Sequence, residues 1–267
     1  MIRINGKVIP INKFPDGTLL IKEKPDYDRA AIAWNFENNE EIIAITYLTH
    51  HLRANGVQSI SLFMPYIPNA RQDRVKSGED VFTLRHFAWL INALMFDKVF
   101  VLDPHSAVSE ALIDRIEVLS PKDYIESAFY RVCADIGNSQ SNILMFYPDE
   151  GAMKRYSSMF HFPYAFGIKK RDWRTGTILG LDVAGDVDAI KGNEIIIVDD
   201  ICSRGGTFYH SAKKLKELGA SRIFLYVTHC ENTILDGEVL SSGLIEKVYT
   251  TDSLFTGKHE RIEVIKL

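Results

Sequence analysis

One stretch of the chain limits the fold more than any other: an apolar run at residues 194–198 ends in two aspartates and leads into a glycine-containing turn. Residues 195–208 read IIIVDDICSRGGTF. A short apolar run bounded by a turn is typical of a buried strand, and the following residues 207–218 are predicted to form a helix that stops at Gly219. A second strand at residues 222–228 completes a strand–helix–strand unit, which predicts a parallel sheet in an α/β fold.

The same alternation precedes this unit. Apolar residues at helical spacing predict a helix over residues 42–52 that ends at Gly56, followed by a strand at 59–65, a long loop at 68–80, a helix at 83–94 and a strand at 98–103. The polar segment 138–142 is the predicted linker, which gives an N-terminal domain of residues 1–138 and a C-terminal domain of 139–267. Parallel strands bind ligands at their carboxyl ends, so we expect five groups to share one such edge: Asp103, His105, Asp149, Asp199 and Asp200.

Composition excludes several classes of protein. The 267 residues are 46% hydrophobic and carry a net charge of −4, and no Lys/Arg stripe marks a nucleic-acid partner. The longest apolar stretch is about ten residues, whereas a membrane span needs roughly twenty. The three cysteines lack metal-ligand or disulfide-framework spacing. These features predict a soluble, cytoplasmic protein that binds neither membrane nor nucleic acid.

The turn after the acidic pair is suited to a phosphorylated sugar. Gly205 and Gly206 let the backbone approach an anion, the amides at the helix start point toward it, and Thr207 offers a hydroxyl. The preceding carboxylates, Asp199 and Asp200, suit sugar hydroxyls or Mg-bound water. The alternative is an ordinary strand-to-helix turn with no ligand.

Two other polar segments are candidates for binding charged groups. Residues 71–74, RQDR, follow a strand and a Pro-rich turn, and Arg forks match phosphate geometry, although a solvated loop has the same composition. Residues 169–176 concentrate Lys and Arg, which predicts a mobile loop that closes over polyphosphate, with a basic surface loop as the alternative. Taken alone, His105 and Asp149 each follow a strand and are equally compatible with a structural role.

Six motifs occur in one order: FPDG (14–17), PYIPNARQDR (65–74), LDPH (102–105), PDEG (148–151), KKR (169–171) and VDDICSRGGT (198–207). In this order they resemble ribose-phosphate pyrophosphokinases, the PRPP synthetases, and they span nearly the whole chain. The resemblance implies two phosphoribosyltransferase-like, Rossmann-like domains with parallel sheets. It also implies a homo-oligomer, a dimer or larger, with its ATP site at the subunit interface.

The resemblance also implies a role for each matching residue. ATP would contact Arg71, Gln72, Asp73 and His105 of one subunit and Phe14 and Asp16 of a neighbour. Mg²⁺ would be held by His105 and Asp149, and Lys169, Arg171 and His105 would be catalytic. The phosphorylated ribose would be held by Asp199, Asp200, Ser203, Arg204, Gly205, Gly206 and Thr207.

The family reaction transfers the β,γ-diphosphate of ATP to the C1 hydroxyl of ribose 5-phosphate, which gives PRPP for nucleotide biosynthesis and releases AMP.

Two residues depart from the family pattern: Thr18 stands where Glu is frequent, and Arg204 replaces a Thr. The chain also ends at the strand-like residues 261–267 without the usual final helix, so a C-terminal truncation is expected. Because Arg204 adds a cation to the turn, ADP-ribose is an alternative acceptor, which would connect the enzyme to NAD metabolism. The remaining alternatives are a type I phosphoribosyltransferase that consumes PRPP and a non-catalytic regulatory partner.

Overall fold

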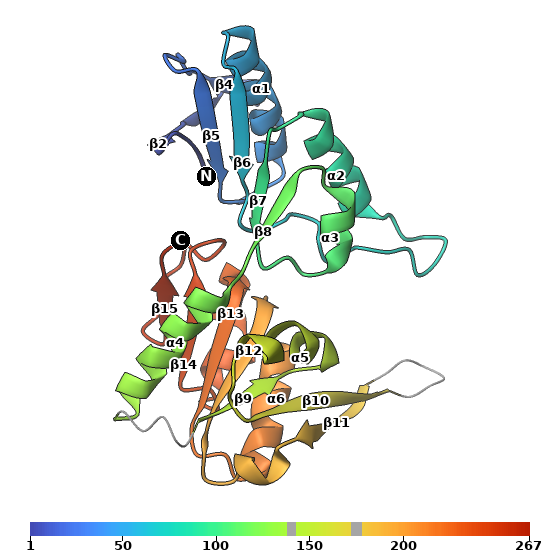
Figure 1. Cartoon of the computed structure of the whole chain (residues 1–267), viewed down its shortest axis with the longest axis vertical. Coiled ribbons are helices and arrows are strands. Elements are labelled where there is room, and N and C mark those ends of the chain that lie inside the picture. Colours follow the sequence, from blue (N-terminus) through green and yellow to red (C-terminus); the bar gives the residue numbers. More distant parts are fainter. Residues whose placement is uncertain (138–142, 172–177) are drawn as a thin grey trace. The chain divides into compact units, whose positions relative to one another are not determined.

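The computed structural model describes residues 1–137, 143–171 and 178–267, and these form two compact units, Met1–Ser120 and Pro121–Leu267 (Figure 1). Each unit has its own largely parallel sheet with helices packed on it, so the predicted α/β class is confirmed. None of the described helices has the length and apolar character needed to cross a membrane.

The first unit contains a six-stranded sheet in the order β2-β1-β5-β6-β7-β8. Strands β5 to β8 run parallel, while β1 pairs antiparallel with both β2 and β5. The strands are β1 (Ile2–Ile4), β2 (Lys7–Val8), β5 (Arg29–Trp34), β6 (Ser59–Phe63), β7 (Val99–Leu102) and β8 (Ile116–Leu119). The helices are α1 (Glu40–Ala54), α2 (Thr83–Ala93) and α3 (Ala107–Leu112), and a separate hairpin joins β3 (Ile11–Lys13) to β4 (Leu19–Ile21).

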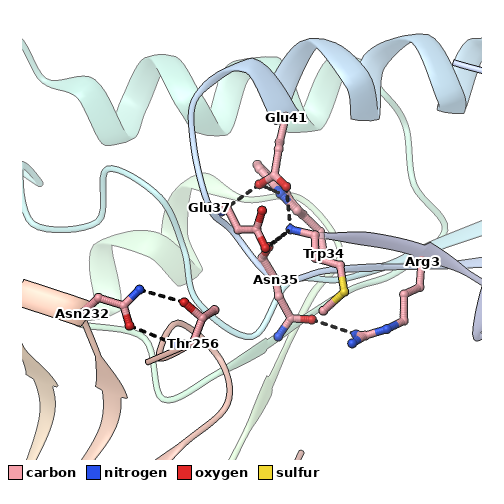
Figure 2. Close-up of polar contacts among 8 residues, drawn as sticks. Arg3, Trp34, Asn35, Glu37, Glu41, Asn232 and Thr256 are labelled. Atoms are coloured by element: carbon pink, nitrogen blue, oxygen red, sulfur yellow. Dashed lines mark hydrogen bonds and ion pairs between the residues drawn. The ribbon is translucent and has the colours of Figure 1, made fainter. Parts of the chain in front are cut away.

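The start of α1 is fixed by a buried carboxylate. One Glu41 oxygen accepts hydrogen bonds from the Trp34 indole at 2.9 Å and from the Glu37 amide at 2.8 Å, as Figure 2 shows for these side chains. An acidic group in the first turn also interacts favourably with the helix dipole. The helix buries Ile45, Leu48 and Leu52 against the sheet, and Gly56, at φ +87°, follows it in the left-handed conformation that the sequence predicts.

The second unit contains a seven-stranded sheet in the order β11-β10-β9-β12-β13-β14-β15, parallel except for the β10–β11 hairpin. The strands are β9 (Ile143–Tyr147), β10 (Tyr164–Arg171), β11 (Ile178–Gly185), β12 (Glu194–Cys202), β13 (Ile223–Cys230), β14 (Lys247–Thr251) and β15 (Ile262–Ile265). The helices are α4 (Lys122–Asp135), α5 (Glu150–Tyr156), α6 (Gly206–Glu217) and α7 (Glu238–Ser241), with 3₁₀ turns η2 (Ser157–Met159), η3 (Val187–Ile190) and η4 (Asn232–Asp236).

Both faces of this second sheet are covered. Side chains of α6 and α7 pack in one apolar cluster with Ile195 and Ile197, and those of α4 and α5 pack in another with Ile196 and Val198. Because successive strand residues face opposite sides, β12 is apolar throughout residues 195–198. The run that defined the sequence analysis is therefore a central, doubly buried strand.

The division between the units precedes α4, whereas the sequence predicted a boundary at 138/139. Helix α4 lies with the second unit because Ile125, Phe129 and Val132 are buried in the same cluster as β9 and β12 residues. The predicted linker, residues 138–142, lies outside the described residues.

The packing of α4 predicts a selective loss of stability. Phe129→Ala removes a buried ring that stacks on Phe162 at 4.6 Å, so we expect the second unit to lose about 3 kcal/mol or more of unfolding free energy. Tyr130→Ala, on the same helix but 62% exposed, is the control and should cost less than about 1 kcal/mol. Urea denaturation followed by amide hydrogen exchange measures both. Faster exchange in β5 and β6 rather than in β9 would contradict the assignment of α4.

Candidate functional site

Two aspartates near the carboxyl end of β12 lie in different surroundings. Asp200 is 3% exposed, and its Oδ1 forms an ion pair with Arg155 Nη1 of α5 at 3.2 Å. Asp199 is partly exposed, and its Oδ1 accepts the backbone N–H of Asp200 at 3.0 Å. Neighbouring strand residues face opposite sides, so one carboxylate of the predicted pair is fixed by α5. The Asp199 carboxylate remains at the carboxyl edge of the sheet, where parallel sheets bind ligands.

The Asp199 carboxylate is in a strongly acidic environment. Burial, the charge of Asp200 and, to a smaller extent, the charge of Asp149 raise the pKa of Asp199 well above its ordinary value. A raised folded-state pKa favours the protonated carboxyl, so this group contributes stability at low pH that is lost as pH rises through the folded pKa. At neutral pH, a cation or a set of hydroxyl donors would stabilise the ionised form.

Asp149 caps α5. Its side chain accepts the Ala152 N–H at 3.1 Å, and it follows β9, the strand that pairs with β12 in parallel. The structure therefore brings Asp149, Asp199 and Asp200 together at the carboxyl edge of one sheet, as the sequence predicts for these three residues.

The turn after β12 is shaped by its own packing. Gly205 has φ +81° and caps α6, and a Cβ there would lie 2.1 Å from Val239 Cγ2. A Cβ on Gly237 would lie 2.0 Å from the Arg204 carbonyl oxygen. Gly206 differs, because a Cβ there would meet no atom within 4 Å. The backbone of the turn is thus pressed against the start of α7, with open space beside the first residue of α6.

The segment behind the turn is itself anchored. The Asn232 amide of η4 donates to Thr256 Oγ1 at 2.8 Å, and its oxygen accepts the Thr256 N–H at 3.0 Å (Figure 2). Ser203, Arg204 and Thr207 stand around the N-terminus of α6, a helix of 12 residues. Backbone amides at the start of a helix of this length are well placed for an anion.

Lys169 and Arg171 lie on a strand, where the sequence predicted a mobile loop. They belong to β10, which pairs antiparallel with β11 through Lys169↔Leu181 and Arg171↔Ile178. Pairing with β11, and with β9 at residues 164–166, extends the strand through Arg171 in spite of the polar composition of its end. Arg174 lies outside the described residues.

The first unit carries a second polar group in the irregular segment between β6 and α2. Arg74 binds Asp73 with two contacts, Nε to Oδ1 at 2.8 Å and Nη2 to Oδ2 at 3.1 Å. Arg74 lowers the pKa of this buried carboxyl, and the nearby Ser106 hydroxyl and His105 charge lower it further. Asp73 and His105 are therefore close together in the described structure.

Gln72 and Asp103, which lie close in sequence to Asp73 and His105, are also locally constrained. Gln72 accepts from the Thr83 hydroxyl at 3.0 Å, which ties the RQDR segment to the start of α2. Asp103, at the end of β7, has φ +43°, a left-handed conformation that is uncommon for a residue with a side chain and is enriched at functional sites. His105 follows two residues later, and Arg71 is exposed on the segment.

The five polar groups predicted for one edge are distributed over two sheets. Asp103 and His105 follow β7 of the first unit, whereas the other three belong to the second. The prediction of a single shared edge was wrong because the strands of the two halves hydrogen-bond only within their own sheets among the described residues.

Phe14 and Asp16 lie in the turn of the β3–β4 hairpin. Asp16 Oδ1 accepts from the Thr18 amide at 3.0 Å and from the Thr18 hydroxyl at 2.7 Å, and these bonds lower the pKa of Asp16. Phe14 is 50% exposed. Thr18, the departure noted in the sequence, thus fixes the carboxylate of a turn that presents an aromatic ring.

No group of three or more His, Cys, Asp or Glu in the described part of the chain is arranged to hold a metal ion. Mg²⁺ does not require one, because it is commonly held by one or two carboxylates together with substrate phosphates and water. The acidic edge formed by Asp149 and Asp199 fits that pattern, since their mutual repulsion is what a divalent cation would relieve.

Sequence reasoning missed the residues that position this site. No motif marks Arg155, Thr83 or the packing of Val239 against Gly205. Arg155 could still have been suspected, as a cation one and a half turns after the Asp149 cap. Which acid it pairs with depends on the approach of α5 to β12.

Comparison with known proteins shows which proteins the chain resembles. No protein-family model matches it. It is 29% identical over 250 residues to the ribose-phosphate pyrophosphokinase of Pyrococcus furiosus, which covers 90% of this chain and 81% of the relative. The enzyme of the same name from Campylobacter jejuni is 29% identical over 227 residues, with 81% and 68% covered. The chain is thus similar over most of its length to ribose-phosphate pyrophosphokinases. A solved phosphoribosylpyrophosphate synthetase from Mycobacterium smegmatis shares the fold, with a TM-score of 0.77 and 21% identity over 97% of this chain and 86% of that one.

The similarity to ribose-phosphate pyrophosphokinases covers both units, and therefore both polar edges. The predicted pair of phosphoribosyltransferase-like halves agrees with the shared fold, and each half contributes the strand-end motifs that carry the resemblance. The strand β15 lies where the sequence predicted one, at the end of the chain.

Substitutions of the two glycines of the turn are expected to differ in their effect on stability. Gly205→Ala places a side chain at positive φ against Val239, so we expect it to lower the unfolding free energy by about 1–3 kcal/mol. Gly206→Ala meets open space and should leave stability within about 0.5 kcal/mol of the parent. Thermal and urea unfolding measure both. Equal effects of the two substitutions would show that α7 does not constrain the turn.

Proposed function

We propose that the protein transfers the β,γ-diphosphate of ATP to the C1 hydroxyl of ribose 5-phosphate and forms PRPP and AMP. The observation that carries the proposal is the end of β12, where a partly exposed aspartate and a glycine turn lead into the start of α6. This arrangement occurs in a chain related over most of its length to ribose-phosphate pyrophosphokinases.

The acceptor binds at the turn after β12. The 5-phosphate is held by the backbone amides of Gly205, Gly206 and Thr207 and by the hydroxyls of Ser203 and Thr207. Asp199 accepts hydrogen bonds from the ribose hydroxyls. Asp200, buried against Arg155, acts as a positioning residue that holds the end of β12. Open space beside Gly206 leaves room for the sugar phosphate.

ATP binds through residues of the first unit. Arg71, Gln72, Asp73 and His105 contact it in one subunit, and the turn that carries Phe14 and Asp16 is supplied by a neighbour, so the protein acts as a homo-oligomer. The exposure of Phe14 and the fixed Asp16 carboxylate support this role for the hairpin. The Asp73–Arg74 contact orders the segment that precedes α2.

The reaction is an in-line displacement at the β-phosphorus. The C1 oxygen of ribose forms the new bond to that phosphorus, the hydroxyl proton is released, and the bond to the bridging oxygen breaks so that AMP leaves with that oxygen. Lys169 and Arg171 neutralise the charge that develops on the transferred phosphates, and His105 is the third residue with a catalytic role in this proposal. Mg²⁺, held by Asp149 and His105 together with the phosphates, would supply further charge neutralisation.

Two other functions are less well supported. A type I phosphoribosyltransferase that consumes PRPP has no use for the ATP-side segment, yet that segment is ordered here by the Asp73–Arg74 and Gln72–Thr83 bonds. A non-catalytic partner would not need the basic strand end that carries Lys169 and Arg171.

A reducing cytoplasmic location agrees with the three buried cysteines, none of which forms a disulfide.

Diphosphate transfer is tested by incubating the purified protein with ATP, Mg²⁺ and ribose 5-phosphate, followed by mass spectrometry of AMP and the sugar product. We expect Lys169→Ala to reduce turnover by about a hundredfold to a thousandfold, because it removes charge stabilisation from the transition state. Lys213→Ala, an exposed lysine of α6, is the control and should retain full activity. Absence of AMP with every acceptor sugar would exclude the proposed reaction.

Arg204 favours ADP-ribose as a second candidate acceptor for the same transfer. Its side chain is exposed, and it has no hydrogen-bond or ion-pair partner in the described part of the chain, while its carbonyl is fixed against Gly237. An unpaired guanidinium beside a phosphate turn suits the diphosphate of ADP-ribose, because Arg can bind two phosphate oxygens at once.

This acceptor preference is tested with Arg204→Thr, which installs the residue typical of the family. If ADP-ribose is the acceptor, we expect kcat/KM for ADP-ribose to fall about tenfold to a hundredfold, the worth of one charged hydrogen-bond pair, with kcat/KM for ribose 5-phosphate unchanged. An equal effect on both acceptors would assign Arg204 to the shared 5-phosphate end instead.

A further inference from the structure

A cavity of about 520 Å³ lies in the first unit, and none of the site residues assigned above lines it. Its walls come from three places: Lys7 of β2, the end of β4 with the residues that follow it, and one side of α1. This volume is within the range of pockets that bind small molecules, roughly 300–1,000 Å³.

The interior of the cavity is apolar. Leu48 of α1 is 1% exposed, and Leu19 and Ile21 of β4 are partly buried beside it. Tyr47, which precedes Leu48 in α1, is 56% exposed and also lines the cavity. An exposed tyrosine next to aliphatic side chains is suited to stacking against a flat ring.

The rim is positively charged. Three lysines line the cavity together with a single acid, Glu23, whose side chain is only 3% exposed. Lys7 binds one Glu23 oxygen at 2.9 Å and the Tyr27 hydroxyl donates to the other at 3.3 Å, so this carboxylate is already satisfied. Lys22 and Lys24 have no partner within the described residues. A local excess of cations is notable in a chain of net charge −4.

The wall between α1 and β4 is also held in place. His51 Nε2 lies 2.8 Å from the Glu23 carbonyl oxygen, and the Asn55 amide lies 3.4 Å from His51 Nδ1. These contacts assign the Nε2–H tautomer, with Nε2 donating to the carbonyl and Nδ1 accepting. The segment with Lys22 and Lys24 is therefore fixed to the helix that supplies Tyr47, and the cavity is preformed.

We propose that this cavity binds a phosphorylated small molecule that contains one aromatic ring, of the size of a nucleoside monophosphate. Lys22 and Lys24 bind the phosphate, and the ring lies over Leu19 and Ile21 against Tyr47. The combination explains why an apolar floor and unpaired cations occur together, since neither a purely apolar ligand nor free phosphate would use both.

Strand β4 connects the cavity to the turn that is proposed to contact ATP. Strand β4 supplies the floor of the cavity and leads directly from the turn that carries Phe14, Asp16 and Thr18. An occupant that joins β4 to α1 restrains the base of this hairpin. The regulatory consequence rests on the proposed function, whereas binding does not.

Binding is tested on the full chain with methyl-labelled Leu and Ile by NMR titration, using UMP, CMP and GMP in the absence of ATP. We expect saturable shifts of the Leu19, Ile21 and Leu48 methyl groups with at least one nucleotide, and affinity about tenfold weaker for the matching nucleoside or for inorganic phosphate alone. Pyrimidine nucleotides are included because the ATP side is expected to favour adenine.

Two variants separate the cavity from general charge effects. Lys22→Glu with Lys24→Glu should weaken binding by about tenfold or more, because two charged contacts are lost, whereas Lys213→Glu on exposed α6 should leave it unchanged. Circular dichroism verifies that each variant is folded. Absence of saturable shifts at these methyl groups with all three nucleotides, or unchanged affinity in the double variant, would overturn the inference. A protein that binds UMP here but transfers no diphosphate would refute only the proposed reaction.

Discussion

The repulsion among Asp149, Asp199 and Asp200 at the end of β12 is the constraint around which the second unit is organised. Burial and neighbouring charge raise the pKa of Asp199, so the edge is costly to keep ionised without a ligand. The protein offsets part of this cost with the Arg155–Asp200 ion pair, and Asp149 is further stabilised as the cap of α5. The negative charge that remains on Asp199 would be stabilised by sugar hydroxyls or by a cation. Unfavourable interactions of this kind are characteristic of functional sites, and they reduce the stability of the protein without its ligand.

The turn beside this edge obtains its shape from packing and not from the ligand. Gly205 has φ +81°, and Val239 leaves no room there for a side chain; Gly237 is likewise the only residue type that leaves space for the Arg204 carbonyl. The amides at the start of α6 are therefore oriented before any phosphate arrives, which lowers the ordering cost of binding. Arg204 is exceptional in this turn, since its backbone is fixed while its side chain is exposed.

The sequence predicts the elements that depend on local pattern and fails where distant packing decides. The buried run of β12, the stops at Gly56 and Gly219 and the strand-end positions of Asp103, Asp149 and Asp199 follow from apolar spacing and glycine chemistry. The extent of β10 does not, because pairing with β11 overrides a polar composition. The membership of α4 in the second unit depends on which sheet buries Phe129. No local signal reports that choice, nor the pairing of Arg155 with Asp200.

The two polar edges differ in their electrostatics, and this difference bears on how the proposed reaction divides its tasks. In the first unit, Arg74 binds Asp73 in a bidentate contact and lowers its pKa, so the acid is neutralised within the protein. In the second unit, burial and the neighbouring acids raise the pKa of Asp199, and Arg155 forms its ion pair with Asp200. A divalent cation gains more at the second edge, because there it removes repulsion between carboxylates, whereas near Asp73 it would compete with a guanidinium. This contrast supports our proposals that Asp149 is a carboxylate ligand of Mg²⁺ and that Asp73 orders the segment proposed to bind ATP.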